Sequence, residues 1–515
     1  MRTTNLISLG LAALALPSQA ITLDINDDAS IKSAASTVAY GMMKYYHGNE
    51  TAQTIGELPW PYYWWHAGAM WGSMMDYWYY TGDTTYNNVT TEAMLFQAGD
   101  DDDYMPLNQT KSEGNDDQAF WGMAAMSAAE VNFPNPPAKK PQWLALAQAV
   151  FNTQALRWDT KSCGGGLRWQ IFTFNNGYNY KNSVSNGGFF NLGARLAKYT
   201  GNTTYSDWAS KTWDWMEESG LMTEDYYVYD GSDTTKNCSS VDKIQWTYNA
   251  GIFLLGAATM WNITGEQVWE DRTRGLWNAT HVFFTDEKIM YEVACEPSGN
   301  CNVDQHFFKA YLARWIAASS KVAPFLSPLI KPYLQASALG AASSCSGGTD
   351  GVTCGTKWFN NVTATSPVGW DQTYGVGQQL CALEVIQSNL IENVKGPVTN
   401  STGGTSTGDD AAGGSGSSDP NRLSKITAAD RAGAVIITLI VLGGQEEEAE
   451  EQVEGQEERA VVQSEDRKEH TVDRVENEDA EAAEGAEGEE YMGDRGEDDK
   501  KHDVGRMTDE GDHAV

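Results

Sequence analysis

Two aspartates stand side by side in the stretch EGNDDQAFWGM, residues 113–123, just before a run of apolar residues with helical spacing. Gly114 and Asn115 are typical of a turn followed by a helix N-cap. Asp116 and Asp117 are therefore predicted to lie at the mouth of a helix. Neighbouring side chains diverge by about 100° within a helix, but at a mouth preceded by glycine both can reach one cleft. The helix dipole favours one carboxylate there, and repulsion offsets the gain from a second.

Glycoside hydrolysis is a reaction that uses two such carboxyl groups. A retaining mechanism needs them about 5–5.5 Å apart, one attacking the anomeric carbon and the other moving a proton. The first carboxyl to ionise raises the pKa of its neighbour, which can then stay protonated as the acid. We predict that Asp116 and Asp117 are catalytic, with helix capping as the alternative.

Tryptophans in predicted loops are candidates for sugar binding, because an indole ring can stack on a sugar face. Trp169 and Trp246 lie in segments flanked by glycine or asparagine that suit loops, and we favour these two. For Trp64, Trp65 and Trp121 we favour packing in the core.

Polar residues at other predicted helix starts are further candidates. Tyr248 and Asn249 in TYNAG are predicted to bond sugar hydroxyls, with capping as the alternative. Asn186 and Asp304 are also candidates for binding sugar hydroxyls, and for both of them helix capping is the favoured alternative. The histidines show no ligand pattern and are assigned to structure, namely His47, His66, His281 and His306. We predict no metal site and no cofactor.

The elements that must position these residues are predicted to be helices. Apolar residues recur at three- and four-residue spacing in segments such as NAGIFLLGAATMW, and convincing alternating strands are scarce. YYTGDTTY (79–86) recurs as KYTGNTTY (198–205) and, in degraded form, as NITGEQVW (262–269). A recurring helix–Thr–Gly–helix unit indicates stacked helical hairpins. We predict an all-α toroid whose loops at one end line a central cleft; an open superhelix is the alternative.

Six segments between residues 24 and 385 form a specific series. They are PYYWWHAGAMWGSMMDYWYYTGD (61–83), DYMPLNQTKSEGNDDQAFWGMAAMSAAE (103–130), CGGGLRWQI (163–171), NGGFFNLGARLAKYTGN (186–202), IQWTYNAG (244–251) and DQHFFKAYLARWI (304–316). In this order they resemble glycoside hydrolase family 76. More closely, they resemble its fungal cell-wall mannan endo-1,6-alpha-mannosidase group, named for defective filamentous growth and defective cell wall.

The resemblance implies an (α/α)6 barrel and retaining action on α-1,6-linked mannose, with Asp116 as nucleophile and Asp117 as acid/base. It implies α-1,6-mannan or the GPI-core mannose glycans as substrate. It also implies a role in wall biogenesis in which GPI proteins are joined to wall glucan as the acceptor. Two features depart from the family pattern: His66 stands where Glu or Gln is more common, and AGDDDDYMP is unusually acidic.

The two ends of the chain differ from its body. Residues 1–20 read as a secretory signal peptide, and residues 21–395 as the (α/α)6 glycoside hydrolase domain. Residues 396–431 are rich in Gly and Ser and are predicted to be a flexible linker. Residues 432–444 form a short apolar segment of the kind found in GPI signals. Residues 445–515 are predicted to be an acidic disordered tail, either a genuine extension or an artefact of the gene model.

Sequons and cysteines agree with export to the cell surface, plasma membrane and cell wall. Nine N-x-S/T sequons occur, at Asn49, Asn88, Asn108, Asn202, Asn237, Asn262, Asn278, Asn361 and Asn400. Disulfides are predicted between Cys295 and Cys301, between Cys345 and Cys354, and between Cys163 and Cys238, which leaves one of the seven cysteines over.

The net charge of −35 is unevenly distributed, because residues 445–515 hold 28 acidic and 8 basic residues. The remaining body is also acidic, which argues against nucleic acid as a partner. We therefore predict a retaining mannan endo-1,6-alpha-mannosidase or transglycosidase, anchored at the plasma membrane through GPI. The alternatives are a non-catalytic glycan-binding or scaffold protein on the same toroid, and an inverting hydrolase with more widely separated carboxylates.

Overall fold

The computed structural model describes residues 20–359 and 368–413. The predicted signal peptide, the apolar segment 432–444, the acidic tail 445–515 and the sequon at Asn361 fall outside the described residues, apart from residue 20. No helix among the described residues has the length and apolar character needed to cross a bilayer.

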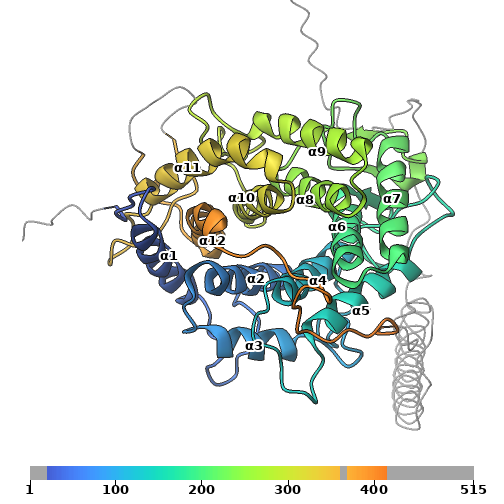
Figure 1. The fold of residues 1–515 in the computed structure, drawn as a ribbon, viewed down its shortest axis with the longest axis horizontal. Helices are drawn as coiled ribbons and strands as arrows, with labels where there is room; N and C mark the ends of the chain where they lie inside the picture. The colour runs from blue at the N-terminus through green and yellow to red at the C-terminus, as the bar shows by residue number, and fades with distance from the viewer. Residues whose placement is uncertain (1–19, 360–367, 414–515) are drawn as a thin grey trace, which may run out of the picture. The chain divides into compact units, whose positions relative to one another are not determined.

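The described chain folds into two concentric rings of helices (Figure 1). The inner ring consists of α2 (Trp64–Thr81), α4 (Asn115–Glu130), α6 (Ser183–Thr200), α8 (Thr247–Thr264), α10 (Gln305–Val322) and α12 (Val376–Gln387). The outer ring consists of α1 (Asp28–Met43), α3 (Asn87–Phe96), α5 (Trp143–Leu156), α7 (Thr203–Glu218), α9 (Gln267–Ala279) and α11 (Ser327–Ser344). Each inner helix packs on the next, and α12 returns to α2. The predicted all-α (α/α)6 barrel is confirmed, and the open superhelix is excluded.

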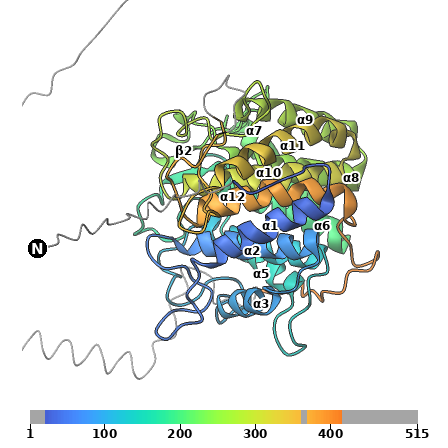
Figure 2. The same ribbon diagram turned by 90° about the vertical axis from the view of Figure 1, so that its left-hand side faces the viewer.

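The two ends of the sequence close the ring. Helix α1 packs along α12, which in turn packs on α10, so the first and last helices lie side by side (Figure 2). Short 3₁₀ turns connect several of the helices: η1 (Thr234–Lys236), η2 (Thr280–Phe283), η3 (Pro324–Leu326) and η4 (Ser388–Asn393).

Sequence pattern separates the inner helices from the outer ones. A helix that is apolar on all sides is stable only when surrounded, whereas an amphipathic helix can cover a core. In α8 every residue from Thr247 to Met260 is buried. In α9 only five side chains are buried, on one face. The inner helix α8 is therefore buried on nearly all sides, whereas the outer helix α9 is buried on one.

The Thr–Gly repeat ends three inner helices. Gly82, Gly201 and Gly265 have φ of 76°, 76° and 66°, in the left-handed region that glycine occupies without a steric penalty. The threonine before each glycine donates its hydroxyl to a carbonyl one turn earlier. The same oxygen then accepts the N–H of the residue after the glycine, at 3.1–3.2 Å. The motif thus turns an inner helix into the next outer one, as the repeat predicted.

Loops on one side of the barrel carry a small antiparallel sheet in the order β1-β2-β3, formed by β1 (Tyr180–Asn182), β2 (Gly231–Asp233) and β3 (Val241–Asp242). A disulfide between Cys163 and Cys238 ties the same loops together. The other two predicted disulfides, Cys295–Cys301 and Cys345–Cys354, are also present, and Cys381 is the free, buried cysteine.

Residues 396–413, which we name the strap, differ from the flexible linker expected there. The N–H of Val398 donates to the carbonyl of Glu130 at 2.8 Å, and that of Asn400 to Tyr199 at 3.0 Å. Further along, Ser406 accepts from the N–H of Leu144 at 2.9 Å. Backbone groups in this stretch pair with α4, α5 and α6, which a composition rich in Gly, Ser and Thr does not reveal. The prediction of a flexible linker is wrong for these residues, and the folded domain extends past Lys395.

Candidate active site

The N-terminal ends of the inner helices surround a cavity of ≈600 Å³. Its walls combine aromatic rings, carboxyl groups and amides, the composition expected of a sugar-binding cleft. The residues that line it are Tyr63, Trp64, Trp65, Gln109, Ser112, Glu113, Asp116, Asp117, Phe120, Trp169, Gln170, Tyr180, Asn182, Asp230, Trp246, Tyr248, Asn302, Asp304, Gln305 and Phe308.

Both aspartates of the predicted pair border this cavity from the first turn of α4. Asp117 Oδ2 accepts the N–H of Gly114 at 2.6 Å. Oδ1 of Asp116 is buried and has no hydrogen-bond partner among the described residues, while the nearby backbone N–H groups of Asp116 and Asp117 oppose the rise of its pKa. The amide of Gly114 therefore holds Asp117 at the cavity, and the other amides of the first turn favour negative charge on Asp116.

Gly114 makes this arrangement possible because it has no side chain. A Cβ there would lie 2.2 Å from Asp116 Oδ1 and 3.0 Å from the carbonyl oxygen of Trp169. Backbone contacts from outside the helix fix this turn. Gly114 forms a β-bridge with Gln170, and the N–H of Asn115 donates to the carbonyl oxygen of Trp169 at 2.8 Å. The glycine is needed for space, since its φ of −91° is ordinary.

Burial raises the pKa of both aspartates. The pKa of Asp117 rises to about 7, with the nearby Asp304 adding to the effect of burial and the Gly114 N–H opposing it. The pKa of Asp116 is raised well above its usual range by burial and by the charge of Asp117. The two carboxyl groups therefore titrate together and share a proton near neutral pH.

Asp304 faces the pair from the start of α10 and does not cap that helix. Its Oδ1 accepts the indole N–H of Trp65 at 2.9 Å and lies 3.0 Å from Nε2 of His66. His66 Nδ1 accepts the N–H of Tyr63 at 2.9 Å, so the ring proton is on Nε2, facing Asp304. Capping is supplied instead by Asn302, whose side chain accepts the N–H of Gln305. His66 is thus structural, as predicted, and it orients Asp304.

Asp230 is a cavity residue that the sequence did not reveal. It accepts the hydroxyl of Tyr180 at 2.7 Å and the indole N–H of Trp246 at 3.0 Å. Burial raises its pKa. It stands in a loop just before β2 with no motif around it, and only the sheet register brings it to β1. The three residues form a hydrogen-bonded wall that fixes the orientation of the Trp246 ring.

The remaining predicted site residues divide into two groups. Trp169 lines the cavity, and so does Tyr248, whose ring stacks on Phe308 at 3.9 Å between centroids. Asn186 and Asn249 do not line it, and that prediction is wrong. The amide of Asn186 is buried and clamps Leu167 through a 2.7 Å bond from the Leu167 N–H and a 3.0 Å bond to its carbonyl. Asn249 is fully buried inside the ring.

Of the tryptophans assigned to the core, Trp121 is fully buried, with its ring stacked on that of Trp64. Trp64 and Trp65 are also largely buried, but each presents an edge to the cavity. Their location at the first turn of α2 explains both properties.

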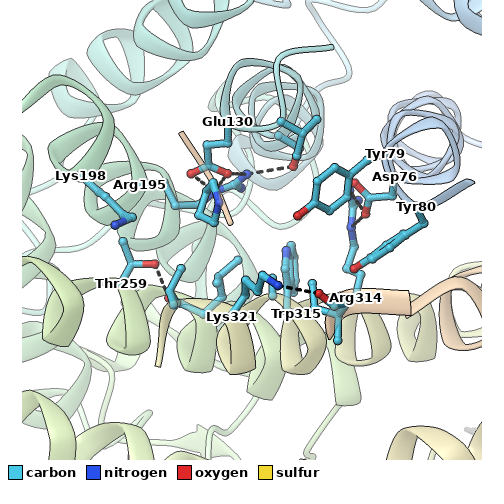
Figure 3. A pocket seen from close by; sticks show the side chains of 17 residues that line it. Asp76, Tyr79, Tyr80, Glu130, Arg195, Lys198, Thr259, Arg314, Trp315 and Lys321 are labelled. Carbon is cyan, nitrogen blue, oxygen red and sulfur yellow. Dashed lines mark hydrogen bonds and ion pairs between the residues drawn. The ribbon is translucent and has the colours of Figure 1, made fainter. Parts of the chain in front are cut away.

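The opposite, C-terminal end of the inner helices holds a much smaller polar cavity of ≈70 Å³ (Figure 3). There Arg195 of α6 bonds Glu130 of α4 with NH2–Oε2 at 2.7 Å. Arg314 of α10 bonds Asp76 of α2 at 2.7 Å and lies 3.9 Å from Glu384 of α12. Basic side chains near helix C-termini complement the negative end of the dipole. The charges at this end are therefore paired across the ring.

An open cleft with paired carboxyl groups and aromatic walls, at the helix N-termini of an (α/α)6 barrel, is the arrangement expected of a glycoside hydrolase. The chain belongs to glycosyl hydrolase family 76, whose model matches residues 30–401.

Proteins similar in sequence and structure to this chain are consistent with that family. The chain is 51% identical to mannan endo-1,6-alpha-mannosidase DCW1 of Saccharomyces cerevisiae, over 82% of this chain and 93% of that protein. It is 45% identical to mannan endo-1,6-alpha-mannosidase DFG5 of the same yeast, over 82% and 92%. The crystal structure of Dfg5 from Chaetomium thermophilum in complex with glucosamine superposes with a TM-score of 0.72, at 45% identity over 76% and 97% of the two chains. The α-1,6-mannanase GH76A of Salegentibacter sp. HEL1_6 shares the fold, with a TM-score of 0.55 at 17% identity over 70% and 98%.

Proposed function

We propose that this glycoside hydrolase acts on α-1,6-linked mannose with retention of configuration, with Asp116 as nucleophile and Asp117 as acid/base. The observation that carries the proposal is the pair of adjacent carboxyl groups that border the cavity from the first turn of α4, one of them held by the amide of Gly114. The relatives named as mannan endo-1,6-alpha-mannosidases support mannan as the substrate class.

The roles within the pair follow the order of the family motif, with the first aspartate as nucleophile. Burial raises the pKa of both carboxyl groups, so the pair binds a proton near neutral pH. In the proposed mechanism Asp117 carries this proton and Asp116 is ionised. In the first step Asp116 attacks the anomeric carbon while Asp117 gives its proton to the departing glycosidic oxygen. In the second step Asp117 takes a proton from the incoming hydroxyl, whose oxygen displaces Asp116 from the sugar.

The other cavity residues have binding roles in this proposal. Trp169 and Trp246 offer aromatic faces for stacking on sugar rings, and Tyr248 closes the floor. Asp230 and Asp304, which line the same cavity, offer carboxyl oxygens to mannose hydroxyls. Charge-assisted hydrogen bonds of this kind are stronger than neutral ones and orient the ring for attack.

The incoming hydroxyl defines the biological role. If it belongs to water, the enzyme hydrolyses α-1,6-mannan; if it belongs to a sugar, the enzyme transfers a mannose-linked chain. We propose the second reaction at the fungal wall, with GPI-core mannose glycans as donor and wall glucan as acceptor. We also propose that the enzyme is exported and held at the cell surface by a GPI-type anchor in its C-terminal region.

The test uses the chain from residue 21 to 413, which includes the strap, with a reduced-end-labelled α-1,6-mannooligosaccharide. Proton NMR follows the anomer released first, and mass spectrometry follows chain length. We expect initial release of the α-anomer, with products longer than the substrate marking transfer. Release of the β-anomer first would exclude the retaining roles of the two aspartates. Binding of the oligosaccharide without turnover would indicate a non-catalytic glycan-binding protein.

A further inference from the structure

A second cavity lies at the same end of the barrel as the catalytic one, at the start of α12. Its volume is ≈350 Å³, which is enough for a small ligand. Among the described residues, no side chain lines both cavities. Tyr62 and Phe307 of the second cavity are nevertheless sequence neighbours of Tyr63 and Phe308 in the catalytic one. The two cavities are therefore separate but adjacent.

Aromatic rings border this second cavity and extend into solvent. Tyr374 lines it and is 69% exposed, and Trp60, which precedes the lining residue Pro61, is 92% exposed. Tyr62 is held in place, because its hydroxyl accepts the N–H of Val376 at 2.9 Å. Large exposed rings beside a cavity are typical of a binding surface, and an aromatic face can stack on a sugar ring.

Gln378 adds a buried amide to the lining of the second cavity. Only 4% of its surface is exposed, and its side chain makes no hydrogen bond to any described residue. In α4 the residue at the equivalent place, Asp117, accepts the N–H of Gly114 three residues earlier. Gln378 has the same spacing from Gly375 at the start of α12 but does not cap it. Because buried amides are normally hydrogen-bonded, this one is expected to have a ligand as its partner.

The charge of the second cavity differs from that of the catalytic one. None of the described residues that line it is an aspartate, glutamate, lysine or arginine. Burial and then the charge of Lys309 lower the pKa of His306 to about 4, so its ring is uncharged near neutral pH. Its Nδ1 lies 3.0 Å from the hydroxyl of Thr356, which fixes the ring. A cavity of this composition favours a neutral polar ligand over an ion.

We propose that the second cavity is a sugar-binding site outside the catalytic one, in which a neutral oligosaccharide stacks on Tyr374 and bonds Gln378 through its hydroxyls. The role of this site rests on the proposed function. In the transfer reaction the mannose donor fills the catalytic cavity, and the acceptor chain has to lie beside it. The second cavity holds that acceptor, the wall glucan, and so raises its concentration next to the catalytic pair.

Calorimetric titration tests the site without turnover. The purified enzyme carries Asp116→Asn and Asp117→Asn and is first saturated with α-1,6-mannohexaose, and a β-1,3-glucohexaose is then titrated in. We expect the glucohexaose to bind with a Kd that the mannohexaose leaves unchanged. Tyr374→Ala and Gln378→Leu should each weaken this binding about tenfold. Tyr40→Ala, which removes a tyrosine of 58% exposure on α1, is the matched control and should leave the Kd unchanged.

Two results would overturn the site itself. One is a glucohexaose Kd that is unchanged in both Tyr374→Ala and Gln378→Leu, and the other is displacement of the glucohexaose by mannohexaose in the presence and absence of Tyr374. Because Tyr374 is exposed, its substitution keeps the fold and decides the question even if Gln378→Leu does not fold. Binding of mannohexaose alone that depends on Tyr374 would keep the site but overturn its role for the acceptor.

Kinetics of the catalytically intact enzyme separate this proposal from the proposed function. Tyr374→Ala should raise the KM for the glucan acceptor about tenfold and leave hydrolysis of the α-1,6-mannooligosaccharide unchanged. Transfer with a wild-type acceptor KM in this variant would overturn the acceptor role. Absence of any turnover in the wild type would reject the proposed function, and the titration of the inactive enzyme would still decide whether the second cavity binds sugar.

Discussion

The two ends of the helical ring differ in how they treat charge. At the N-terminal end, carboxyl groups gather around a cavity of ≈600 Å³ and most are held by amides, indoles or hydroxyls without a cation. At the C-terminal end, carboxylates pair with arginines across the ring and leave ≈70 Å³. The direction of the inner helices explains the difference, because acidic groups are favoured at their beginnings and basic groups at their ends. The N-terminal end keeps buried carboxyl groups without cations, which costs stability, whereas the ion pairs at the C-terminal end compensate the buried charges.

The largest effect should come from the catalytic pair. Asp116→Asn removes the nucleophile and Asp117→Asn removes the acid/base, and each should lower kcat by about 10³-fold or more. The asparagine side chains fit the same turn, so circular dichroism should be unchanged. A wild-type rate in either variant would mean that the two aspartates only cap the helix.

The next effect concerns the paired end. Arg314→Met leaves Asp76 and Glu384 buried without their cation, and we expect a loss of about 3–5 kcal/mol in the free energy of unfolding, measured in urea. Lys331→Met breaks an exposed pair with Glu392 and should cost less than about 1 kcal/mol. Activity per folded molecule should be unaffected in both. Loss of activity without loss of stability in Arg314→Met would mean that the two ends are coupled.

A glycine at each end allows a matched test. Gly114→Ala places a methyl group against Asp116 Oδ1, and we expect kcat/KM to fall by about 10²-fold because the carboxyl must move. Gly82→Ala meets no atom within 4 Å but retains a left-handed φ of 76°, so it should cost about 1–2 kcal/mol of stability and no activity. Equal kinetic effects of the two substitutions would contradict the division of roles.

The last prediction concerns the dependence of stability on pH. The folded-state pKa of Asp117, about 7, lies above its unfolded value of 3.8, so the folded protein binds the proton more tightly. Stability contributed by this group should therefore fall as pH rises from 4 to 7. Asp117→Asn removes that dependence, and we expect it to be more stable than wild type by on the order of 2 kcal/mol at neutral pH and equally stable near the unfolded pKa. Thermal unfolding across this pH range measures it. The wild-type rate should also decline as pH rises through about 7, since the acid must be protonated.

The sequence predicted the parts of the site that lie at helix starts. Asp116, Trp246 and Asp304 were singled out because turn residues and helical periodicity mark those positions, and all three line the cavity, although capping was the favoured role for Asp304. The toroid was predicted because the Thr–Gly repeat identifies the hairpins that form it. Asn186 and Asn249 share the same local pattern as the residues that line the cavity but are fully buried, and only packing distinguishes them.

The residues that were missed depend on long-range contacts. Asp230 reaches the cavity through strand register, and Glu113 precedes the isolated β-bridge between Gly114 and Gln170. The strap was predicted to be a linker because its glycines look flexible. Instead, Gly404 and Gly408 lie against Tyr199 and Gln148 so closely that a side chain would not fit. No local property of these segments carries that information.

Closure of the ring by α1 and α12 has a consequence for synthesis of the protein. Ile31, Val38 and Met42 of α1 are buried in the folded barrel, and α12 is the last helix of the ring to be made. A chain growing from its N-terminus exposes this apolar face until more than 300 further residues have left the ribosome, as the α1–α12 contact requires. Contacts between such distant segments form slowly and leave intermediates prone to association. The architecture that creates a central cleft thus delays burial of this apolar face until the last helix of the ring has been made.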